Sequence, residues 1–198
     1  MNHENRDVYS GLSNAAWGYF FLHFDFNLNN VSIFPRFVGW LLLLSACKKL
    51  SGERRDLALL RPLAVLLAAW HAADWLLSWG GGDVNGHILF LDLLLAVAGL
   101  YFHFQFLTDM AALAERYQPK GAGLDRQLCS RRTVYVVLIT LAALLGDLNL
   151  LVKLPEHWGE WIAIGMSLTA LIAAVMIMAA LFRLRRFFRE GETEQPVA

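Results

Sequence analysis

The sequence has few charged residues, few cysteines and few prolines. Charged residues make up 17% of its 198 residues, against about 25% in an ordinary soluble domain. Its two cysteines are too few for the disulfide framework of a small secreted domain. Hydrophobic residues make up 57% and the mean hydropathy is +0.45, which is more apolar surface than a soluble chain of this size can bury. These values exclude a disordered or soluble protein. They predict an all-α, polytopic transmembrane helical bundle that forms a single domain over residues 1–198.

Six apolar segments define the expected helices. They lie at about 14–28, 34–50, 56–79, 86–117, 132–151 and 155–188, and a short cytosolic tail follows over 189–198. The last four are long enough to cross a hydrocarbon core of about 30 Å, which takes ~20 helical residues. The first two are short, and whether the first spans the bilayer stays open. Because Asn27, Asn29, Asn30 and Pro35 cluster where the first segment ends and the second begins and disfavour a helix, we expect a hairpin over 14–50 with a non-helical outer bend.

Basic residues are distributed very unequally between the two sides of the predicted bundle. If the segments alternate in direction, fifteen of the 17 Lys and Arg fall on one side, and only Arg36 and Lys153 fall on the other. Positively charged loops stay in the cytosol, so this bias places both termini on the cytosolic side of a bacterial cytoplasmic (inner) membrane. Cys47 and Cys129 would lie on that side as unpaired thiols. The arginines between 183 and 189 are typical of the cytosolic end of a last helix, so the lipid bilayer, and no nucleic acid, is the expected partner.

Ionisable residues inside the apolar segments are the informative ones, because an ionised side chain at mid-bilayer costs roughly 2.5–3.5 kcal/mol on insertion scales. His103 would lie deep, toward the inner side. The outer half and the outer loops hold seven acidic residues against two basic ones, a balance that attracts cations or protons. The candidate residues for a polar pocket in the outer half are His23, Asp25, His71, Asp74, Asp92 and Asp147.

Helical spacing decides which of these side chains can meet. His71 and Asp74 are three residues apart and share a helix face, whereas Asp92 lies at a similar depth on the adjacent antiparallel segment. We therefore predict that these three side chains face one another, with at least one of the two carboxylates protonated near neutral pH because of burial and like charge. His23 and Asp25 point about 200° apart on a regular helix, so they can share a pocket only if the helix breaks there.

Three interpretations of this pocket remain open. The first is a site that binds or transports a proton, a cation or a small cationic solute, for which carboxylates and imidazoles within hydrogen-bond reach suffice. The second is a metal site, since imidazole and carboxylate suit zinc, manganese or iron. No HExxH or clustered-cysteine motif indicates one, so metal content and cofactor stay open. The third is a set of structural pairs that fix helix register, in a structural or assembly subunit without a site of its own.

Small residues give a further hint about packing. Ala68 and Ala72 are four residues apart on the third segment, a spacing that lets two membrane helices approach closely. The close approach could lie within the bundle or between the copies of a homo-oligomer. The sequence does not decide between them.

The run FDFNLNNVSIFPRFVGWLL over residues 24–42 carries a resemblance to a known group of proteins. Together with Lys48-Lys49-Leu50 and Leu60-Arg61-Pro62-Leu63, it resembles the N-terminal region of a group of small bacterial integral membrane proteins that have no assigned activity. The shared pattern is a polar turn, Ile-x-Pro-x-Phe-Val-Gly, an apolar helix, a basic exit and an Arg-Pro pair. The resemblance covers between a quarter and a third of the chain, and it implies a multi-pass membrane fold without implying a reaction.

A second resemblance concerns the acidic residues. Leu145-Gly146-Asp147, taken with Asp92 and His103, is similar to the Gly-Asp and His elements of membrane-embedded lysoplasmalogenases, which have more helices. It implies the enzyme alternative, an intramembrane lipid hydrolase whose Asp and His act as acid–base groups or metal ligands. We favour a binding or transport protein over this enzyme.

Overall fold

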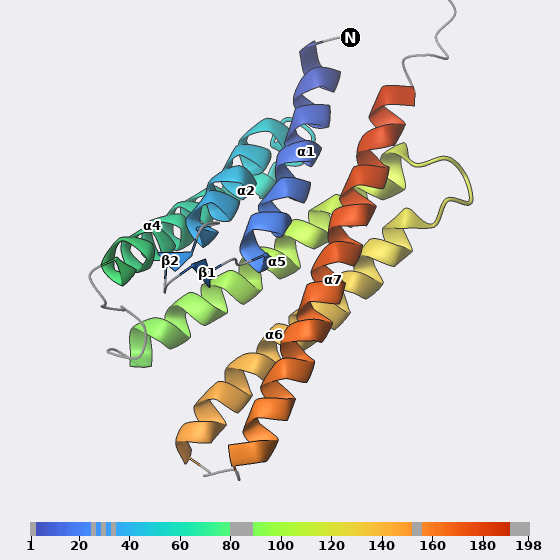
Figure 1. The fold of residues 1–198 in the computed structure, drawn as a ribbon. Helices are drawn as coiled ribbons and strands as arrows, with labels where there is room; N and C mark the ends of the chain where they lie inside the picture. Colours follow the sequence, from blue (N-terminus) through green and yellow to red (C-terminus); the bar gives the residue numbers. More distant parts are fainter. Residues whose placement is uncertain are drawn as a thin grey trace, which may run out of the picture.

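A computed structural model of the chain describes residues 3–24, 27–28, 31–32, 35–79, 89–151 and 156–190. These residues form a helical bundle (Figure 1), which confirms the predicted helical class. The one departure from an all-α fold is a pair of two-residue antiparallel strands, β1 and β2. The elements are α1 (His3–His23), β1 (Asn27–Leu28), β2 (Val31–Ser32), α2 (Arg36–Leu50), α3 (Asp56–Leu59), α4 (Arg61–Ser78), α5 (Leu89–Tyr117), α6 (Leu124–Leu151) and α7 (Glu156–Glu190).

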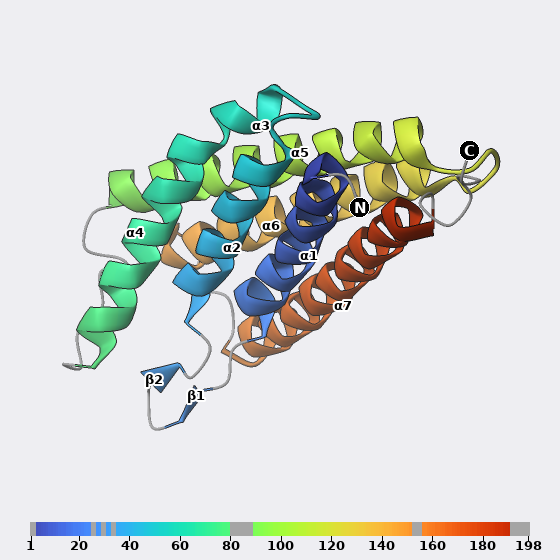
Figure 2. The ribbon, with the colours of Figure 1, turned by 90° about the horizontal axis from the view of Figure 1, so that it is seen from above.

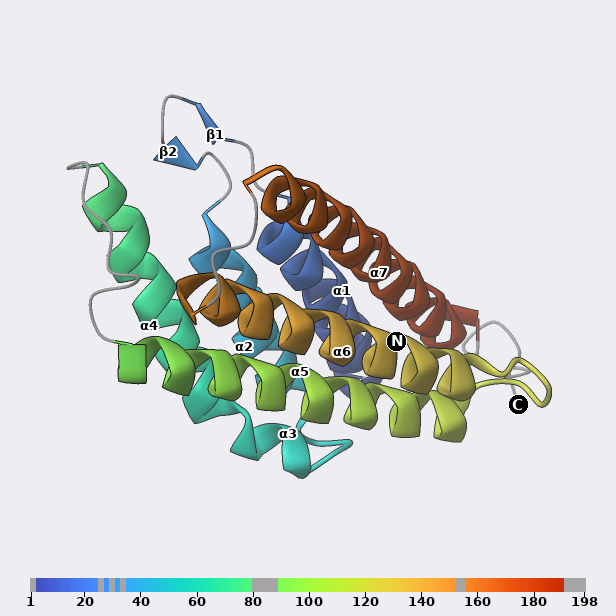
Figure 3. The same ribbon diagram turned by 90° about the horizontal axis from the view of Figure 1, so that it is seen from below.

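The six long helices form a closed ring of neighbours. Around the ring the order is α4, α2, α1, α7, α6, α5, and each helix contacts the next. Successive helices run in alternating directions, so the start of α1, the short α3 and the end of α7 gather at one end of the bundle, while β1 and β2 lie at the other (Figure 2). The ring is loosest between α4 and α5, whose contacts are few. Seen from below, the end of α4 and the start of α5 spread apart (Figure 3).

Three helical stretches among the described residues are long and apolar enough to cross a membrane. They are Asp56–Ser78, Phe90–Tyr117 and Ile164–Phe188, of 23, 28 and 25 residues, and they match the third, fourth and sixth predicted segments. Their exposed side chains include Leu76, Phe90 and Leu168, as expected of a surface that lipid covers. The composition and length of these helices support a membrane location, whereas a span at 132–151 stays a prediction.

The first two predicted segments form the expected hairpin, but the boundary predicted for the first segment is wrong. α1 runs from His3 to His23 instead of 14–28, and Asn27–Leu28 belong to β1, which pairs with β2 through Asn27↔Ser32 and Leu28↔Val31. The polar start of α1 is helical because Val8 and Leu12 are buried in the bundle. Tertiary burial here outweighs the weak local preference of a polar sequence.

The fifth predicted segment also begins too late in our sequence reading. We expected 132–151, whereas α6 begins at Leu124. Leu124 and Leu128 are fully buried, so the first two turns pack against the bundle although the sequence between them is polar. Gln118 supports this start, because its Oε1 accepts hydrogen bonds from the backbone N–H groups of Leu124 (2.7 Å) and Asp125 (3.4 Å) and so supplies two of the partners that a helix start lacks.

α1 and α2 approach each other closely at two glycines. A Cβ added to Gly39 would lie 2.9 Å from the backbone carbonyl oxygen of Gly18, and one added to Gly18 would lie 3.1 Å from that of Gly39. The 2.9 Å contact is shorter than a Cβ tolerates and the 3.1 Å contact would require the neighbouring backbone to shift, so glycine at both positions favours the close approach of the two backbones. The consequence is that Tyr19 and Trp40, the next residues along each helix, are carried into the centre of the bundle.

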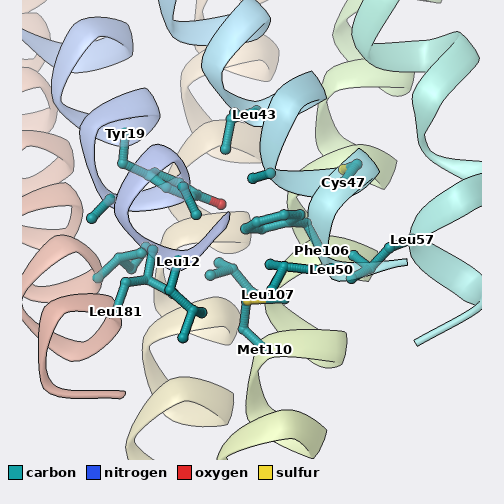
Figure 4. Packing of buried hydrophobic residues seen from close by; sticks show 14 of the residues in the cluster. Leu12, Tyr19, Leu43, Cys47, Leu50, Leu57, Phe106, Leu107, Met110 and Leu181 are labelled. Atoms are coloured by element: carbon teal, nitrogen blue, oxygen red, sulfur yellow. The ribbon is translucent and has the colours of Figure 1, made fainter. Parts of the chain in front are cut away.

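The centre of the bundle is a contiguous apolar cluster. Leu12 of α1, Leu43 and Leu50 of α2, Phe106 of α5 and Leu181 of α7 are all fully buried in it (Figure 4). Cys47 is buried in the same cluster and Cys129 is half-buried, and both are unpaired thiols, as predicted. Ala68 is buried inside the bundle, where it packs against the core rather than facing outward.

Candidate functional site

Two phenol–imidazole pairs lie in the interior of the bundle. The Tyr19 hydroxyl of α1 is 3.1 Å from Nδ1 of His103 of α5. The Tyr135 hydroxyl of α6 is 2.6 Å from Nε2 of His23, at the end of α1. Tyr19, His103 and Tyr135 are buried and His23 is half-buried. We call these four residues the His–Tyr cluster; it joins α1, α5 and α6.

The hydrogen bonds fix the tautomer of a neutral His23. Its Nδ1 is 2.9 Å from the backbone carbonyl oxygen of Tyr19, which can only accept, so Nδ1 must carry the proton. In the neutral ring Nε2 is then an acceptor, and the Tyr135 hydroxyl donates to it. Every polar atom in this pair is satisfied without a formal charge, which is the least costly way to hold polar groups in a low-dielectric interior.

The rings of the cluster also pack on one another. The rings of Tyr19 and His23 are stacked with centroids 6.2 Å apart, and Tyr135 meets the ring of His103 edge-on at 5.2 Å. Such stacked and edge-on contacts stabilise aromatic pairs beyond the area they bury. Packing and hydrogen bonding therefore hold the imidazole of His103 in one orientation.

A groove of about 370 Å³ lies beside this cluster, where α4 and α5 diverge. Its α5 residues follow the spacing i, i+3, i+4, i+7, i+8 and i+11, so the groove runs along three turns of α5, or about 16 Å. α4 forms the opposite wall, α2 supplies Trp40 and α6 supplies Ile139. The lining residues are Trp40, Leu67, Trp70, His71, Asp92, Leu95, Ala96, Gly99, Leu100, His103 and Ile139.

Trp40 connects the groove to the His–Tyr cluster. Its ring lies parallel to that of His71 with centroids 6.2 Å apart, and 5.2 Å from the centroids of both Phe102 and His103. Only 4% of Trp40 is exposed, and its indole N–H has no hydrogen-bond partner among the described residues. Because buried donors are almost always paired, this unpaired N–H is an unusual feature of the interior of the bundle.

The structure brings together only part of the predicted pocket. His71 and Asp92 line the groove, together with His103, which the sequence places on the same face of its helix as Asp92. Asp74 is half-buried one turn further along α4 and is not a lining residue. The lining of the groove therefore includes one carboxylate, and both the contact between Asp74 and Asp92 and the protonation of one of them stay predictions.

The other predicted site residues lie elsewhere. His23 belongs to the His–Tyr cluster, where its Nε2 meets the Tyr135 hydroxyl, and it is not among the residues that line the groove. The helix break that we considered between His23 and Asp25 is present, since α1 stops at His23. Asp25 and the side chain of Asp147 lie outside the described residues.

Sequence reasoning missed the tyrosines and tryptophan that complete the site. Tyr19, Tyr135 and Trp40 are not among the predicted site residues, yet each places a polar atom in the interior. It also missed Asp109, a fully buried carboxylate of α5 that accepts hydrogen bonds from Arg54 (3.2 Å) and from Gln105 (3.3 Å). The usable signal was an acid inside an apolar segment, six residues after His103.

No group of three or more His, Cys, Asp or Glu in the described part of the chain is arranged to hold a metal ion. Comparison of the chain with protein-family models, with curated proteins and with solved structures gave no match. The groove and the His–Tyr cluster are therefore the features of the described residues that bear on function.

Proposed function

We propose that this chain is a six-span protein of the bacterial cytoplasmic membrane, with both termini in the cytosol, and that its groove binds a small organic cation. The three apolar helices and the fifteen-to-two distribution of basic residues support the membrane placement. The observation that carries the ligand class is that one carboxylate, Asp92, shares a groove with the indole rings of Trp40 and Trp70.

The chemistry of the lining favours a cation. Asp92 is the acidic residue of the lining, and apart from the imidazoles of His71 and His103 the remaining lining residues are apolar or aromatic. Indole faces attract ammonium groups through the ring quadrupole, and a carboxylate in a low-dielectric groove gains much from a counter-ion.

The size of the groove favours a small solute. A volume of about 370 Å³ is at the lower end of the range of ligand pockets, about 300–1,000 Å³. A groove that is mostly apolar with a few polar groups is also the usual make-up of a small-molecule site. A hydrated inorganic ion would leave the apolar lining without a partner.

Calorimetric titration of the full chain in lipid nanodiscs with hexylammonium tests this function. The variant Asp92→Asn should bind hexylammonium about 10- to 100-fold more weakly, the size of one charge pair in a partly wet site. Asp74→Asn is the matched control and should change the affinity less than about threefold. Hexanol should bind the wild type and Asp92→Asn equally, because it has no charge to lose.

A second pair of variants controls for partitioning of the probe into lipid. A Cβ on Gly99, which lines the groove, and one on Gly165 of α7 would each meet no atom within 4 Å. Gly99→Leu should fill the groove and abolish saturable binding, whereas Gly165→Leu should leave it intact. Equal binding by the wild type and Gly99→Leu would contradict the proposal.

Topology is tested separately with a reporter fused after Ala198. A reporter that is active only in the cytosol should be active, and one that requires the periplasm should be silent. The opposite result would overturn the depth assigned to every residue of the groove. Labelling of Cys129 by a membrane-impermeant maleimide in intact cells would contradict the placement in the same way.

A further inference from the structure

Two arginines approach each other at the seam between α6 and α7, which lie side by side (Figure 1). Nη1 of Arg131 of α6 donates a hydrogen bond to the backbone carbonyl oxygen of Met176 of α7, a residue that is 44% exposed. This carbonyl points toward the C-terminus of α7, as carbonyls in an α-helix do. Arg183 is seven residues further along the same face of α7, and its Cα–Cβ bond leans back toward Met176. The two guanidinium groups therefore converge on one stretch of the seam.

Neither arginine has an anionic partner in the part of the chain that the structure describes. Arg131 forms no ion pair there and hydrogen-bonds to the Met176 carbonyl, whereas Arg183 forms neither kind of bond there. Burial and, after it, the charge of Arg183 lower the pKa of Arg131. Two like charges thus lie close together, and a negative charge between them would be stabilised by both.

The guanidinium of Arg131 has donors that remain accessible. Its Nε and Nη2 make no hydrogen bond within the described ranges, and they are not among the nitrogens that the fold buries without a partner. Nε of the neighbouring Arg132, by contrast, is buried. Two adjacent N–H groups of a guanidinium form the fork that binds two oxygens of a phosphate at once. Arg183 is exposed and can approach the same phosphate from α7.

The two arginines lie where an apolar surface begins. Arg183 is five residues, or about 8 Å, inside the end of the apolar stretch Ile164–Phe188, and Arg131 directly precedes the predicted segment 132–151. Further from the cytosolic end, the exposed side chains of the two helices include Val134, Leu168 and Ile172. Cationic groups beside an apolar face at this depth match a phospholipid, whose charged headgroup adjoins its acyl chains.

We propose that the α6–α7 seam binds an anionic phospholipid of the cytosolic leaflet, with its phosphate between Arg131 and Arg183 and its acyl chains along the exposed apolar face of the two helices. This inference rests on the membrane placement in the proposed function and is independent of cation binding in the groove. Phosphate is the group that fits, because it offers charged acceptor oxygens to both guanidinium groups. Basic pockets between helices on the cytosolic side are typical sites for lipid headgroups. A free phosphate ion would leave the apolar face uncovered.

The test titrates the full chain, purified in a neutral detergent, with three probes and measures the bound fraction by native mass spectrometry. The probes are dioleoylphosphatidylglycerol, the diacylglycerol with the same chains, and glycerol 3-phosphate. Phosphatidylglycerol should bind at least about tenfold more tightly than either of the others, because it combines the charged phosphate with the acyl chains. This comparison uses the wild type alone, so it stands even if a variant fails to fold.

Arg183→Gln removes one guanidinium group from an exposed position. It should weaken the binding of phosphatidylglycerol by about tenfold, the size of one charge-assisted hydrogen bond at an exposed site, and should leave the binding of diacylglycerol within about twofold. Arg131→Gln should have the same effect. Lys48→Gln is the matched control, because it removes an exposed cation from the same end of the bundle on α2, which contacts neither α6 nor α7. It should change the affinity for phosphatidylglycerol less than about twofold.

Three results would contradict the inference. If Lys48→Gln weakens the binding of phosphatidylglycerol as much as Arg183→Gln does, the lipid responds to the net charge of this end and the seam is not a site. If diacylglycerol binds as tightly as phosphatidylglycerol, the apolar face alone holds the lipid. If glycerol 3-phosphate binds as tightly, the seam takes a free phosphate and the lipid assignment is wrong.

Failure of the proposed function would look different. Binding in detergent does not depend on the orientation of the chain, so a reporter active in the periplasm would move the seam to the other leaflet and leave the lipid assignment standing. Loss of hexylammonium binding in the groove would not affect it either.

Discussion

Two regions of the bundle hold their polar side chains in different ways: the charged level, at the end where α3 lies, and the neutral level, around the middle of α5. At the end where α3 lies, the groups are charged: Arg54 is 3.2 Å from Asp109, and Arg116 is 3.2 Å from Glu53. Around the middle of α5 they are neutral, as in the phenol–imidazole pair Tyr19–His103. The charged pairs have water within reach, since the side chains of Arg54 and Arg116 are 39% and 67% exposed.

The difference follows from the cost of burying charge. Removing an ion from water costs several kcal/mol even after relaxation, and a partner repays this only with good geometry. Neutral hydrogen bonds satisfy the same polar atoms without that cost. A fully buried carboxylate such as Asp109 is therefore placed where a long arginine reaches it from the surface, whereas the interior of the bundle uses tyrosine, histidine and tryptophan.

The charged level should contain the most costly single substitution, Arg54→Met. It leaves Asp109 buried without its cation. Loss of one partner of a buried pair typically costs about 3–5 kcal/mol, and we expect about 3 kcal/mol because Arg54 reaches solvent. The free energy of unfolding in mixed micelles of increasing denaturing detergent measures it.

Two variants sharpen this result. Arg116→Met should cost less than about 1 kcal/mol, because Arg116 is exposed and surface ion pairs contribute little. The double variant Arg54→Met/Asp109→Leu should recover most of the loss, since no charge is then stranded. If Arg54→Met and Arg116→Met lower the free energy of unfolding by the same amount, the buried pair contributes no more to stability than the exposed pair.

The neutral level depends on the contact between α1 and α2, and Gly39→Ala should break it. The new Cβ would lie 2.9 Å from the Gly18 carbonyl oxygen and 2.8 Å from Leu22 Cγ, and overpacking of this kind costs about 1–3 kcal/mol. Gly165→Ala meets no atom within 4 Å and should stabilise by up to about 1 kcal/mol through helix propensity. The free energies of unfolding of the two variants, measured in mixed micelles, should change in opposite directions. An unchanged free energy of unfolding for Gly39→Ala would show that α1 and α2 can move apart without cost.

Sequence reasoning recovered the features that depend on local pattern. The helical class, the hairpin of α1 and α2, and the placement of His71 and Asp92 in one groove follow from apolar periodicity and from the cost of polar groups in apolar segments. The errors lie where distant contacts decide. α1 and α6 begin earlier than predicted because buried residues such as Val8 and Leu124 hold polar turns against the bundle.

The centre of the site could not be read from the sequence for the same reason. Tyr19 and His103 are 84 residues apart, and His23 and Tyr135 are 112 apart, so no local spacing connects them. A tyrosine in an apolar helix has the same pattern whether its hydroxyl reaches an imidazole or a headgroup. Local spacing also does not show that α4 and α5 diverge at the end that carries Asp74 and Asp92 (Figure 3), where Asp92 lines the groove and Asp74 does not.

A smaller effect is expected from Tyr135→Phe in the neutral level. The substitution leaves the acceptor Nε2 of His23 without its donor, and a stranded acceptor costs about 1–2 kcal/mol. Since neither group is charged, the loss should not change between low and high salt, in contrast to that of Arg116→Met. Tyr101→Phe, at an exposed tyrosine (54% exposed), should cost almost nothing. A salt-dependent loss for Tyr135→Phe would show that the pair carries charge.

The smallest expected effect concerns the loop between α5 and α6 and the residue Asp125 that follows it. This loop lies at the charged level and precedes the predicted membrane segment at 132–151. The Gln118 side-chain amide donates to Asp125 Oδ1 at 2.7 Å and, with the backbone N–H of Arg126, holds the pKa of Asp125 below its ordinary value. A lowered folded pKa means that the ionised form supports the fold. The contribution is therefore complete above the unfolded pKa of about 3.9 and is lost as the pH falls through the folded pKa.

Gln118→Ala removes that donor, so the pKa of Asp125 should rise toward its ordinary value. The same change removes Oε1, which accepts from the first two backbone N–H groups of α6, and the first turn of α6 should fray. NMR titration of the Asp125 carboxyl carbon in the full chain measures the first effect, and amide exchange at Leu124 measures the second. Glu115→Gln, at an exposed residue of the preceding helix, should move neither. If the Asp125 titration midpoint is the same with and without Gln118, the amide does not hold this carboxylate, and the charged level is stabilised by its arginine pairs alone.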